Sequence, residues 1–214
     1  MSDNIVLIDP NETSGSNCLI LGGSSTGKTS LLVSALRNLD RLSPHHYDVR
    51  LLFTGSINAK PFVHLPKDII IFKAFLPKLI KKLVSIQQLT SNRYNILLIF
   101  DDIPDLRGKI AEKIFTIYRN SNISCIALIQ HYSYVTPAMR DSCHNLYITG
   151  ARNTGAREKL INLFIKPYLI DRGFRTKTAH DNYVRDATFM GDSSRNLIHI
   201  DTTADEMNVI SLRK

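Results

Sequence analysis

The sequence predicts an α/β fold in which a central, mainly parallel β-sheet is flanked by helices. Short apolar runs alternate along the chain with segments whose apolar residues recur at helical spacing, which is the order expected of parallel strands joined by helices. The most apolar run, residues 96–100, contains no polar residue, as in a strand that is buried on both faces. The 214 residues, of which 43% are hydrophobic, are enough to form one sizeable core.

Strands are expected wherever a short apolar run ends at a turn or at a polar residue. The first of these runs leads directly into a glycine-rich stretch, and the last two lie near the end of the chain. In chain order, the expected strands are residues 18–21, 49–53, 68–72, 96–100, 123–129, 146–149, 197–200 and 209–212. No internal repeat and no linker interrupts this series, so we expect one sheet.

Helices are expected in the segments between the strands. The first begins near Lys28, where apolar residues start to recur at helical spacing. Two further helices are expected at residues 77–89 and 106–118. Thr136 and Pro137 are typical of an N-cap and of a first helical residue, so a short helix is expected to start there.

Basic residues outnumber acidic residues in this chain. The 27 Lys and Arg residues, against 19 Asp and Glu, give a formal net charge of +8. A surplus of this size favours a polyanionic partner such as nucleic acid, although many basic proteins bind no DNA. Three lysines form a basic face on the expected helix 77–89: Lys78, Lys81 and Lys82.

The sequence contains neither a membrane-span pattern nor a metal-binding cysteine or histidine pattern. No window approaches the roughly 20 uninterrupted apolar residues of a transmembrane helix, and the first residues lack the basic flank of a signal peptide. The three cysteines, Cys18, Cys125 and Cys143, lie far apart in apolar stretches. This distribution indicates core positions in a reducing compartment. We therefore expect an intracellular protein with no membrane span.

A glycine-rich stretch separates the first expected strand from the first expected helix. Glycines let successive backbone N–H groups turn toward an anion, and the helix that follows presents the positive end of its dipole to that anion. In this pattern Lys28 would reach the β- and γ-phosphates of ATP, and the Thr29 hydroxyl would bind Mg²⁺. The residues expected to cradle the nucleotide are Gly22, Gly23, Ser24, Ser25, Thr26, Gly27, Lys28, Thr29 and Ser30.

Polar side chains follow two of the expected strands. Asp101 and Asp102 come directly after the strand 96–100, where a carboxylate can bind the metal of a Mg²⁺-nucleotide. Asp101 fits this metal role, and Asp102 is placed to polarise a water molecule, unless it only caps a helix. Gln130 follows the strand 123–129, where it can bond the γ-phosphate or the attacking water, or simply end the strand.

Taken together, these motifs resemble the viral DNA-packaging ATPases of the FtsK/HerA superfamily, and in particular the poxvirus-type ATPases of large DNA viruses. The resemblance covers about residues 18–149. Its more specific parts are the paired acids at the end of residues 97–103, the Arg and small polar turn within 118–124, and the Met-Arg-Asp at 139–141. The family often has His where Asn120 stands in this sequence.

The resemblance implies an ASCE/RecA-like P-loop NTPase fold and a set of catalytic roles. Lys28 and Thr29 would act on the phosphates and the metal, Asp101 on the metal, Asp102 as the catalytic base and Gln130 as the sensor. These five residues would complete one nucleotide site within one chain. It also implies double-stranded DNA as a partner, a homo-oligomeric ring, and a capsid or portal-vertex protein as a further partner.

An arginine finger from a neighbouring subunit is a further implication of the resemblance. Arg119 is the first candidate, and its alternative role is a solvated arginine at a helix C-terminus. Arg140 is the second candidate. The whole chain, residues 1–214, is expected to be a single P-loop ATPase domain with a core of about residues 17–150. Residues 151–214 would then form a C-terminal extension packed on that core.

Two other functions remain open at this point. A nucleoside or nucleotide kinase uses the same phosphate loop with an arginine-rich lid, which Arg152, Arg157 and Lys159 could form. A non-motor scaffold protein could instead keep ATP as a structural ligand. The paired acids and Gln130 favour the packaging ATPase, which would work in the host cytoplasm or a viral factory and could associate with the virion.

Overall fold

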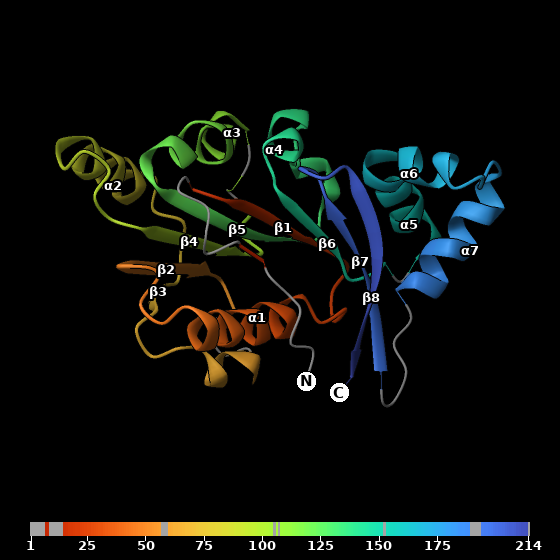
Figure 1. The fold of residues 1–214 in the computed structure, drawn as a ribbon, viewed down its shortest axis with the longest axis horizontal. Coiled ribbons are helices and arrows are strands. Elements are labelled where there is room, and N and C mark those ends of the chain that lie inside the picture. The colour runs from red at the N-terminus through yellow and green to blue at the C-terminus, as the bar shows by residue number, and fades with distance from the viewer. Residues whose placement is uncertain are drawn as a thin grey trace.

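The computed structural model describes residues 7–8, 15–56, 60–104, 106, 108–151, 153–188 and 194–213. These residues form an eight-stranded sheet with the strand order β3-β2-β4-β5-β1-β6-β7-β8 (Figure 1). Strands β1 to β6 run parallel to one another, and β7 and β8 are antiparallel additions at one side. The predicted α/β fold with a mainly parallel sheet is therefore confirmed.

The strands match the apolar runs of the sequence to within a few residues. They are β1 (Asn17–Leu21), β2 (Val49–Thr54), β3 (Ile70–Phe72), β4 (Ile96–Asp101), β5 (Ile123–Ile129), β6 (Asn145–Ile148), β7 (Ser194–Asp201) and β8 (Glu206–Arg213). Every residue of β1, β4 and β5 is buried. Their largely apolar sequences match a sheet that is covered by helices on both faces.

The described helices lie between these strands in the chain. The α-helices are α1 (Lys28–Leu42), α2 (Pro77–Leu89), α3 (Gly108–Thr116), α4 (Pro137–Asp141), α5 (Thr154–Leu160), α6 (Lys166–Asp171) and α7 (Lys177–Ala187). Shorter turns are η1 (Lys60–His64), η2 (Tyr118–Ser121) and η3 (Tyr132–Tyr134), which are 3₁₀-helical, and η4 (Ile161–Ile165), which is π-helical. Thr136 caps α4 as predicted, since its hydroxyl accepts a hydrogen bond from Met139 N at 3.3 Å.

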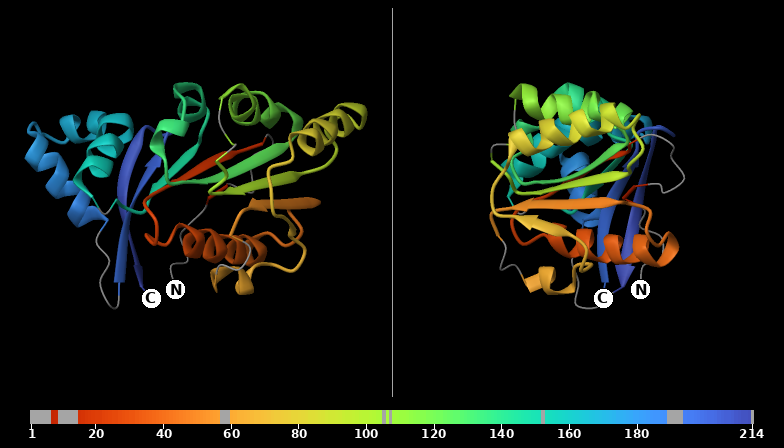
Figure 2. Two further views of the ribbon diagram at one scale, coloured as in Figure 1. Left: turned by 180° about the vertical axis from the view of Figure 1, so that it is seen from behind. Right: turned by 90° about the vertical axis from the view of Figure 1, so that its left-hand side faces the viewer.

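Two hydrophobic layers hold the sheet between helices. α1 covers one face, and α2, α3 and α4 cover the other (Figure 2). Alternate residues of β1 serve the two layers: Leu19 and Leu21 pack in the cluster under α2 to α4, whereas Cys18 and Ile20 pack in the cluster under α1. This period of two is the expected consequence of a strand buried on both faces.

The predicted helix 106–118 is shorter in the structure. α3 covers Gly108–Thr116, and the next residues form the separate turn η2. The turn ends at Asn122, which has a left-handed backbone with φ 52°. Asn tolerates this conformation better than most residues, and it lets the chain reverse into β5. The expected strand 68–72 likewise begins two residues later, at Ile70.

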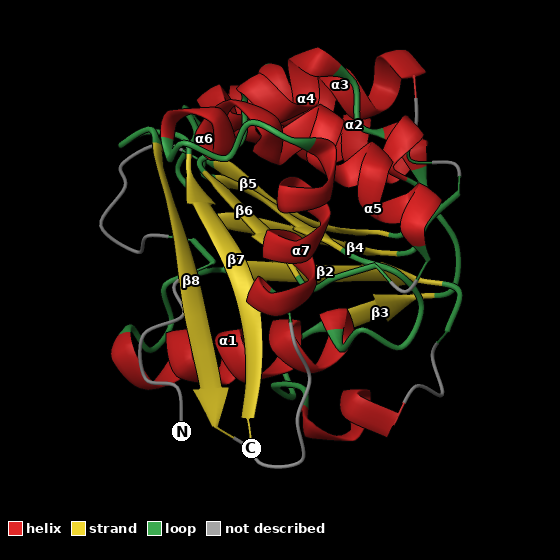
Figure 3. Ribbon diagram, turned by 90° about the vertical axis from the view of Figure 1, so that its right-hand side faces the viewer, coloured by secondary structure: helices red, strands yellow, loops and turns green. Residues whose placement is uncertain are grey.

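The C-terminal part of the chain continues the sheet. The end of β7 pairs with β6, and β8 pairs with β7, while α5, α6 and α7 gather beside them (Figure 3). The division of a single domain into a core of residues 17–150 and an extension of residues 151–214 stays a prediction. Within the described residues, no helix combines the length and the apolar character that crossing a membrane requires.

Candidate functional site

The glycine-rich loop leaves β1 at the carboxyl edge of the sheet and enters α1. Two backbone hydrogen bonds fix its first residues to the neighbouring strands, because Gly22 N donates to Ile129 O at 3.1 Å and Gly23 N donates to Gly150 O at 2.9 Å. Since β1 lies between β5 and β6, the loop is held from both sides. This fixed entrance places the rest of the loop above the ends of the parallel strands, where ligands of such sheets bind.

Two glycines of the loop are required by their surroundings. A Cβ atom on Gly22 would collide with Thr149 Oγ1 and would lie 2.6 Å from Thr26 Oγ1. These two threonine hydroxyls are hydrogen-bonded to each other at 2.7 Å, so they cannot easily move away. Gly27 has φ 80°, a left-handed conformation that side chains disfavour. The loop therefore has the close-packed backbone that a phosphate cradle needs.

Lys28 is buried at the first turn of α1. Its Nζ atom donates to Gly22 O at 3.0 Å and to Gly23 O at 2.9 Å, so the ammonium group lies against its own loop. Burial lowers the pKa of Lys28, and the Asp102 and Asp101 carboxylates oppose this shift. Of the remaining cradle residues, Thr29 is half-buried. The loop tip, Ser24 and Ser25, and the third residue of α1, Ser30, are exposed.

Asp101 ends β4 at the same edge of the sheet. It stands opposite Thr54 of β2 in the register, and its Oδ2 atom accepts a hydrogen bond from Thr54 Oγ1 at 3.1 Å. Burial raises the pKa of Asp101 and Asp102 raises it further, while the Thr54 bond and Lys28 act in the opposite direction. A nearly buried carboxylate of this kind gains from a cation placed beside it.

The oxygen atoms near the loop are of the kind that Mg²⁺ prefers. Mg²⁺ is usually held by one or two carboxylates together with substrate phosphates, so Asp101 and the Thr29 hydroxyl fit it as a ligand set. The part of the chain that the structure describes holds no group of three or more His, Cys, Asp or Glu that could bind a metal by itself.

Asp102 and Gln130 are in direct contact. Gln130 Nε2 donates to Asp102 Oδ2 at 2.6 Å, which brings together two residues that the sequence placed at the ends of adjacent strands. Asp102 has a left-handed backbone with φ 52°, and this turns its carboxylate out of the strand direction. Non-glycine residues with such a backbone concentrate at functional sites. The exposed Asp102 can be approached by a substrate or by water.

Arg119 lies at the opposite, amino edge of the sheet. It belongs to η2, just before β5 begins at Ile123, and its side chain is half-exposed. Its carbonyl accepts a hydrogen bond from Gly15 N at 3.0 Å. Arg119 is thus separated from the glycine-rich loop of its own chain by the length of the strands. The structure does not bring it together with the other predicted site residues.

Arg140 is engaged within its own chain. It lies in α4, which ends shortly before β6 begins, so it also lies toward the amino edge. Its Nη1 atom donates to Leu163 O at 2.8 Å, and its Nε atom lies 3.3 Å from Asp141 Oδ1. Its contacts thus tie α4 to the π-helical turn η4.

The described geometry agrees with the comparisons to known proteins. The family model of the Poxvirus A32 protein matches residues 13–156, which include the loop, both acids, Gln130 and both arginines. This chain belongs to the Poxvirus A32 protein family. The match confirms the resemblance inferred from the sequence. Among curated proteins, none matches the sequence of this chain.

Solved structures share the fold of this A32-family chain at low sequence identity. The genome packaging NTPase B204 of Sulfolobus turreted icosahedral virus 2, in complex with AMPPCP, is 10% identical over 97% of this chain and 99% of its own, with a TM-score of 0.62. Its complex with ATP-gammaS gives a TM-score of 0.59 at 11% identity, over 97% of this chain and 98% of its own. The pCW3 conjugation coupling protein TcpA is 13% identical over 96% of this chain and 61% of its own, with a TM-score of 0.60.

Sequence reasoning missed three residues of the site in this A32-family chain. Thr54 holds Asp101, Thr149 packs against Gly22, and Arg195 of β7 contacts the loop. A polar residue after the apolar run 51–53 was the signal for Thr54. The position of Thr149, just beyond β6, is equivalent to that of Gln130 just beyond β5, which was recognised. Arg195 carries no local signal in the sequence.

Two of the three residues considered for a kinase lid lie among the described residues, both on α5. Arg152 lies outside the described residues. Arg157 is paired with Asp181, its Nε atom lying 2.8 Å from Asp181 Oδ1, and Lys159 is exposed on α5. This pair ties α5 to α7 within the C-terminal part of the A32-family chain.

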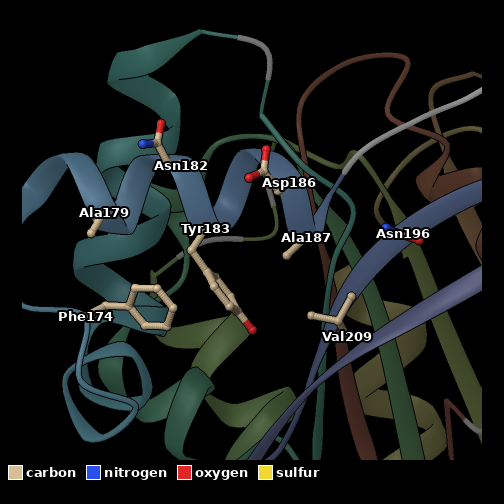
Figure 4. Close-up of a pocket in the computed structure, with 8 residues that line it drawn as sticks. All are labelled: Phe174, Ala179, Asn182, Tyr183, Asp186, Ala187, Asn196 and Val209. Carbon is tan, nitrogen blue, oxygen red and sulfur yellow. The ribbon is translucent and has the colours of Figure 1, made fainter.

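An open groove of about 570 Å³ lies between α7 and the strands β7 and β8 (Figure 4). Tyr183 extends across it from α7, and Val209 closes it from β8. It contains none of the residues predicted for the nucleotide site. The lining residues are Phe174, Ala179, Asn182, Tyr183, Asp186, Ala187, Asn196 and Val209.

Proposed function

We propose that this chain is an ATP-hydrolysing motor that moves double-stranded DNA into a viral capsid. Membership of the Poxvirus A32 family supports this function, as does the fold it shares with B204, whose name describes a genome packaging NTPase. The observation that carries the proposal is the set of contacts at one edge of the sheet. There, a close-packed glycine loop with its lysine adjoins a buried carboxylate and an Asp–Gln pair.

We propose that the loop binds the triphosphate of ATP. Its N–H groups would face the β-phosphate, and Lys28 would exchange the carbonyls of Gly22 and Gly23 for phosphate oxygens. Thr29 and Asp101 would hold Mg²⁺, which supplies positive charge against the β- and γ-phosphate oxygens when bound. Burial raises the pKa of Asp101, and a Mg²⁺ ion bound beside this carboxylate would favour its ionised form.

Hydrolysis is assigned to the Asp102–Gln130 pair. A water molecule would attack the γ-phosphorus and give up a proton to Asp102, while the bond to the β–γ bridging oxygen breaks and ADP leaves. The amide of Gln130, which bonds Asp102 at 2.6 Å, fixes the direction of that carboxylate. Gln130 can also bond the γ-phosphate, and its change of partner would report which nucleotide is bound.

Arg119 is proposed as the finger that completes a neighbouring subunit's site. Its backbone is firmly held, since Gly15 N bonds its carbonyl and the buried Gln87 of α2 bonds Ser121 O at 2.7 Å. A fixed backbone with a half-exposed side chain suits a residue that must reach outward. An amino-edge finger and a carboxyl-edge cradle can meet only between chains, and such head-to-tail contacts close into rings.

DNA binding is proposed to rest on phosphate contacts. The net charge of +8 gives the chain a favourable field for a polyanion. Lys78, Lys81 and Lys82 are all exposed on the outer side of α2, as the sequence predicted. Grip through phosphates is independent of base sequence. A capsid or portal-vertex protein would receive the DNA, and the motor would act in the host cytoplasm or viral factory and could remain with the virion.

The test is ATP turnover with and without double-stranded DNA, with Lys28→Ala as the inactive reference. We expect DNA of any sequence to stimulate turnover, and DNA affinity to fall steeply between about 50 and 200 mM salt because counterions are released. A mass measurement should show the ring.

Two results would replace the proposed function. Stimulation by a nucleoside in place of DNA would indicate a kinase. Tight nucleotide retention without turnover would indicate a scaffold protein.

A further inference from the structure

A buried arginine from the end of the chain touches the phosphate loop. Arg195 lies near the start of β7, which runs antiparallel to β6, so this end of β7 reaches the carboxyl edge of the parallel strands. Leu197, two positions later, packs in the cluster under α1. Because side chains alternate along a strand, Arg195 points to the same face and meets the first turn of α1.

The guanidinium group forks across two carbonyls of the loop. Arg195 Nη1 donates to Gly27 O at 3.1 Å, and Arg195 Nη2 donates to Thr26 O. A Cβ atom on Gly27 would collide with Nη1, so this contact is a second reason for glycine at that position, beside its φ of 80°. The contact therefore depends both on the guanidinium group of Arg195 and on the lack of a side chain at Gly27.

Arg195 has no carboxylate partner among the described residues. Its side chain is only 8% exposed, and its Nε atom has no hydrogen-bond partner. Burial lowers the pKa of Arg195, and no acidic group in the part of the chain that the structure describes counters this shift. Buried charges are normally paired, because the desolvation of an isolated cation is costly. An anion held by the adjacent loop could balance the positive charge of Arg195.

The two carbonyls that Arg195 bonds belong to peptide groups whose N–H groups are part of the phosphate loop. Thr26 O shares its peptide plane with Gly27 N–H, and Gly27 O shares its plane with Lys28 N–H. A cation that holds both oxygens from behind fixes the planes and directs the two N–H groups to the opposite side, toward the cradle. A charged donor at each oxygen also polarises the peptide and strengthens the N–H as a donor.

We propose that Arg195 is a positioning residue of the nucleotide site: it orients the N–H groups of Gly27 and Lys28 toward the β-phosphate, and its charge offsets part of the phosphate charge. This inference rests on the proposed function, since it presumes a nucleoside di- or triphosphate in the loop. It makes the C-terminal part of the chain a component of the site. The loop is then held by two cations, Lys28 at Gly22 and Gly23, and Arg195 at Thr26 and Gly27.

The experiment measures Mg²⁺-ADP affinity by titration in three variants and in the wild type. Arg195→Gln should weaken ADP binding by about 10- to 100-fold, the range of charged hydrogen bonds. Arg195→Lys keeps a cation but cannot fork across two carbonyls, so it should recover only part of the affinity. Arg157→Gln is the matched control, because Arg157 is a largely buried arginine of the same C-terminal part that is paired with Asp181.

Thermal unfolding without nucleotide separates the effect of a substitution on nucleotide binding from its effect on the stability of the fold. Both Gln variants should lower Tm, but Arg157→Gln should bind ADP within about twofold of wild type, because the Arg157–Asp181 pair joins α5 to α7 and the Arg157 bond to Ala151 O is long, at 3.4 Å. In ATP turnover, Arg195→Gln should raise KM more than it lowers kcat, since the residue acts on binding common to ground and transition states.

Three outcomes would decide against the proposal or its basis. Wild-type ADP affinity in Arg195→Gln would overturn the inference while leaving the proposed function intact. If Arg195→Gln does not fold, wild-type affinity in Arg195→Lys would overturn it equally. A wild-type chain that binds no ADP would instead overturn the proposed function.

Discussion

The two edges of the sheet are built differently. At the carboxyl edge, hydrogen bonds within the chain hold the side chains: Lys28 donates to its loop, Thr54 donates to Asp101 and Gln130 donates to Asp102. At the amino edge, Arg119 is fixed through its backbone, while its side chain stays half-exposed. The carboxyl edge thus resembles a preorganised nucleotide site, whereas the amino edge resembles an interface that contributes one side chain to another subunit.

This difference separates what one chain can do from what an assembly can do. Preorganised groups lower the cost of binding, so a single chain should bind nucleotide. Groups that stabilise charge only in the transition state increase the rate of ATP hydrolysis, and another subunit can supply them. We therefore expect binding and turnover to respond to different edges of the same sheet.

The largest expected effect comes from Arg119→Ala at the amino edge. A finger in trans is worth roughly 10³–10⁵ in rate, so turnover should fall by that order while ATP affinity stays unchanged. Single-turnover kinetics together with equilibrium titration would measure the two separately. Arg140→Ala is the matched comparison, and it should lower stability more than turnover because Arg140 already bonds Leu163 O.

Mixing Arg119→Ala with Lys28→Ala tests whether the arginine serves a neighbour. Mixed rings would place intact loops beside subunits that still carry Arg119, so partial activity should return. Rings that demonstrably mix and yet stay inactive would rule out the trans finger, and Arg140 should then take the same test.

A smaller loss is expected from Asp102→Asn at the carboxyl edge. Removal of the proton acceptor should lower turnover by about 10²–10⁴, with Mg²⁺-ATP still bound through Asp101 and Lys28. Asn also tolerates the left-handed backbone of this position and can still accept the bond from Gln130, so the fold should be unaffected. Near-normal turnover would show that another residue is the base.

The smallest effect, and one of opposite sign, is expected from Asp101→Asn. The pKa of Asp101 is raised in the folded chain, so its ionised form costs stability at neutral pH. The folded chain gains stability as pH falls from its folded pKa toward its unfolded one. Asp101→Asn should therefore raise Tm at pH 7 by a few degrees, since about 1 kcal/mol corresponds to roughly 2–4 °C at this size.

Thermal scans from pH 4 to pH 8 would follow this difference. It should shrink in acid, where the wild-type carboxyl is already protonated. Addition of Mg²⁺-ATP should reverse the order of the two proteins, because only the wild type retains the carboxylate ligand. A lower Tm for Asp101→Asn at pH 7 without nucleotide would contradict the buried-charge explanation.

The carboxyl edge could largely be predicted from the sequence because its residues follow local rules. A strand, a glycine loop and a helix are contiguous, and Asp101, Asp102 and Gln130 each end an apolar run. Parallel topology then brings strand ends together without any knowledge of side-chain geometry. The alignment of β4 and β5 at this edge, where Asp101 stands opposite Leu128, placed Gln130 within reach of Asp102.

Other features depend on tertiary contacts that no local pattern encodes. Arg195 is one of many arginines in the sequence, and only the antiparallel pairing of β7 with β6 brings it to Gly27. Thr54 gains its role from the register between β2 and β4. The end of α3 at Thr116 and the separate turn η2 after it are likewise not encoded by helical periodicity, which alone extends the helix to residue 118.

The strand order has a consequence for how the chain is made. β1 pairs with β5 and β6, so Asn17 can form its pairing only after Cys125 has been synthesised. Gly27 likewise gains its contact only after Arg195, which lies 168 positions later. Contacts of such long sequence separation form late, because closing the intervening loop costs entropy first. During synthesis from the N-terminus, the phosphate loop therefore leaves the ribosome before β5, β6 and β7, and it gains its contacts with them only after they have followed. A nascent chain that stops before β7 would carry the whole loop sequence without the arginine that holds it.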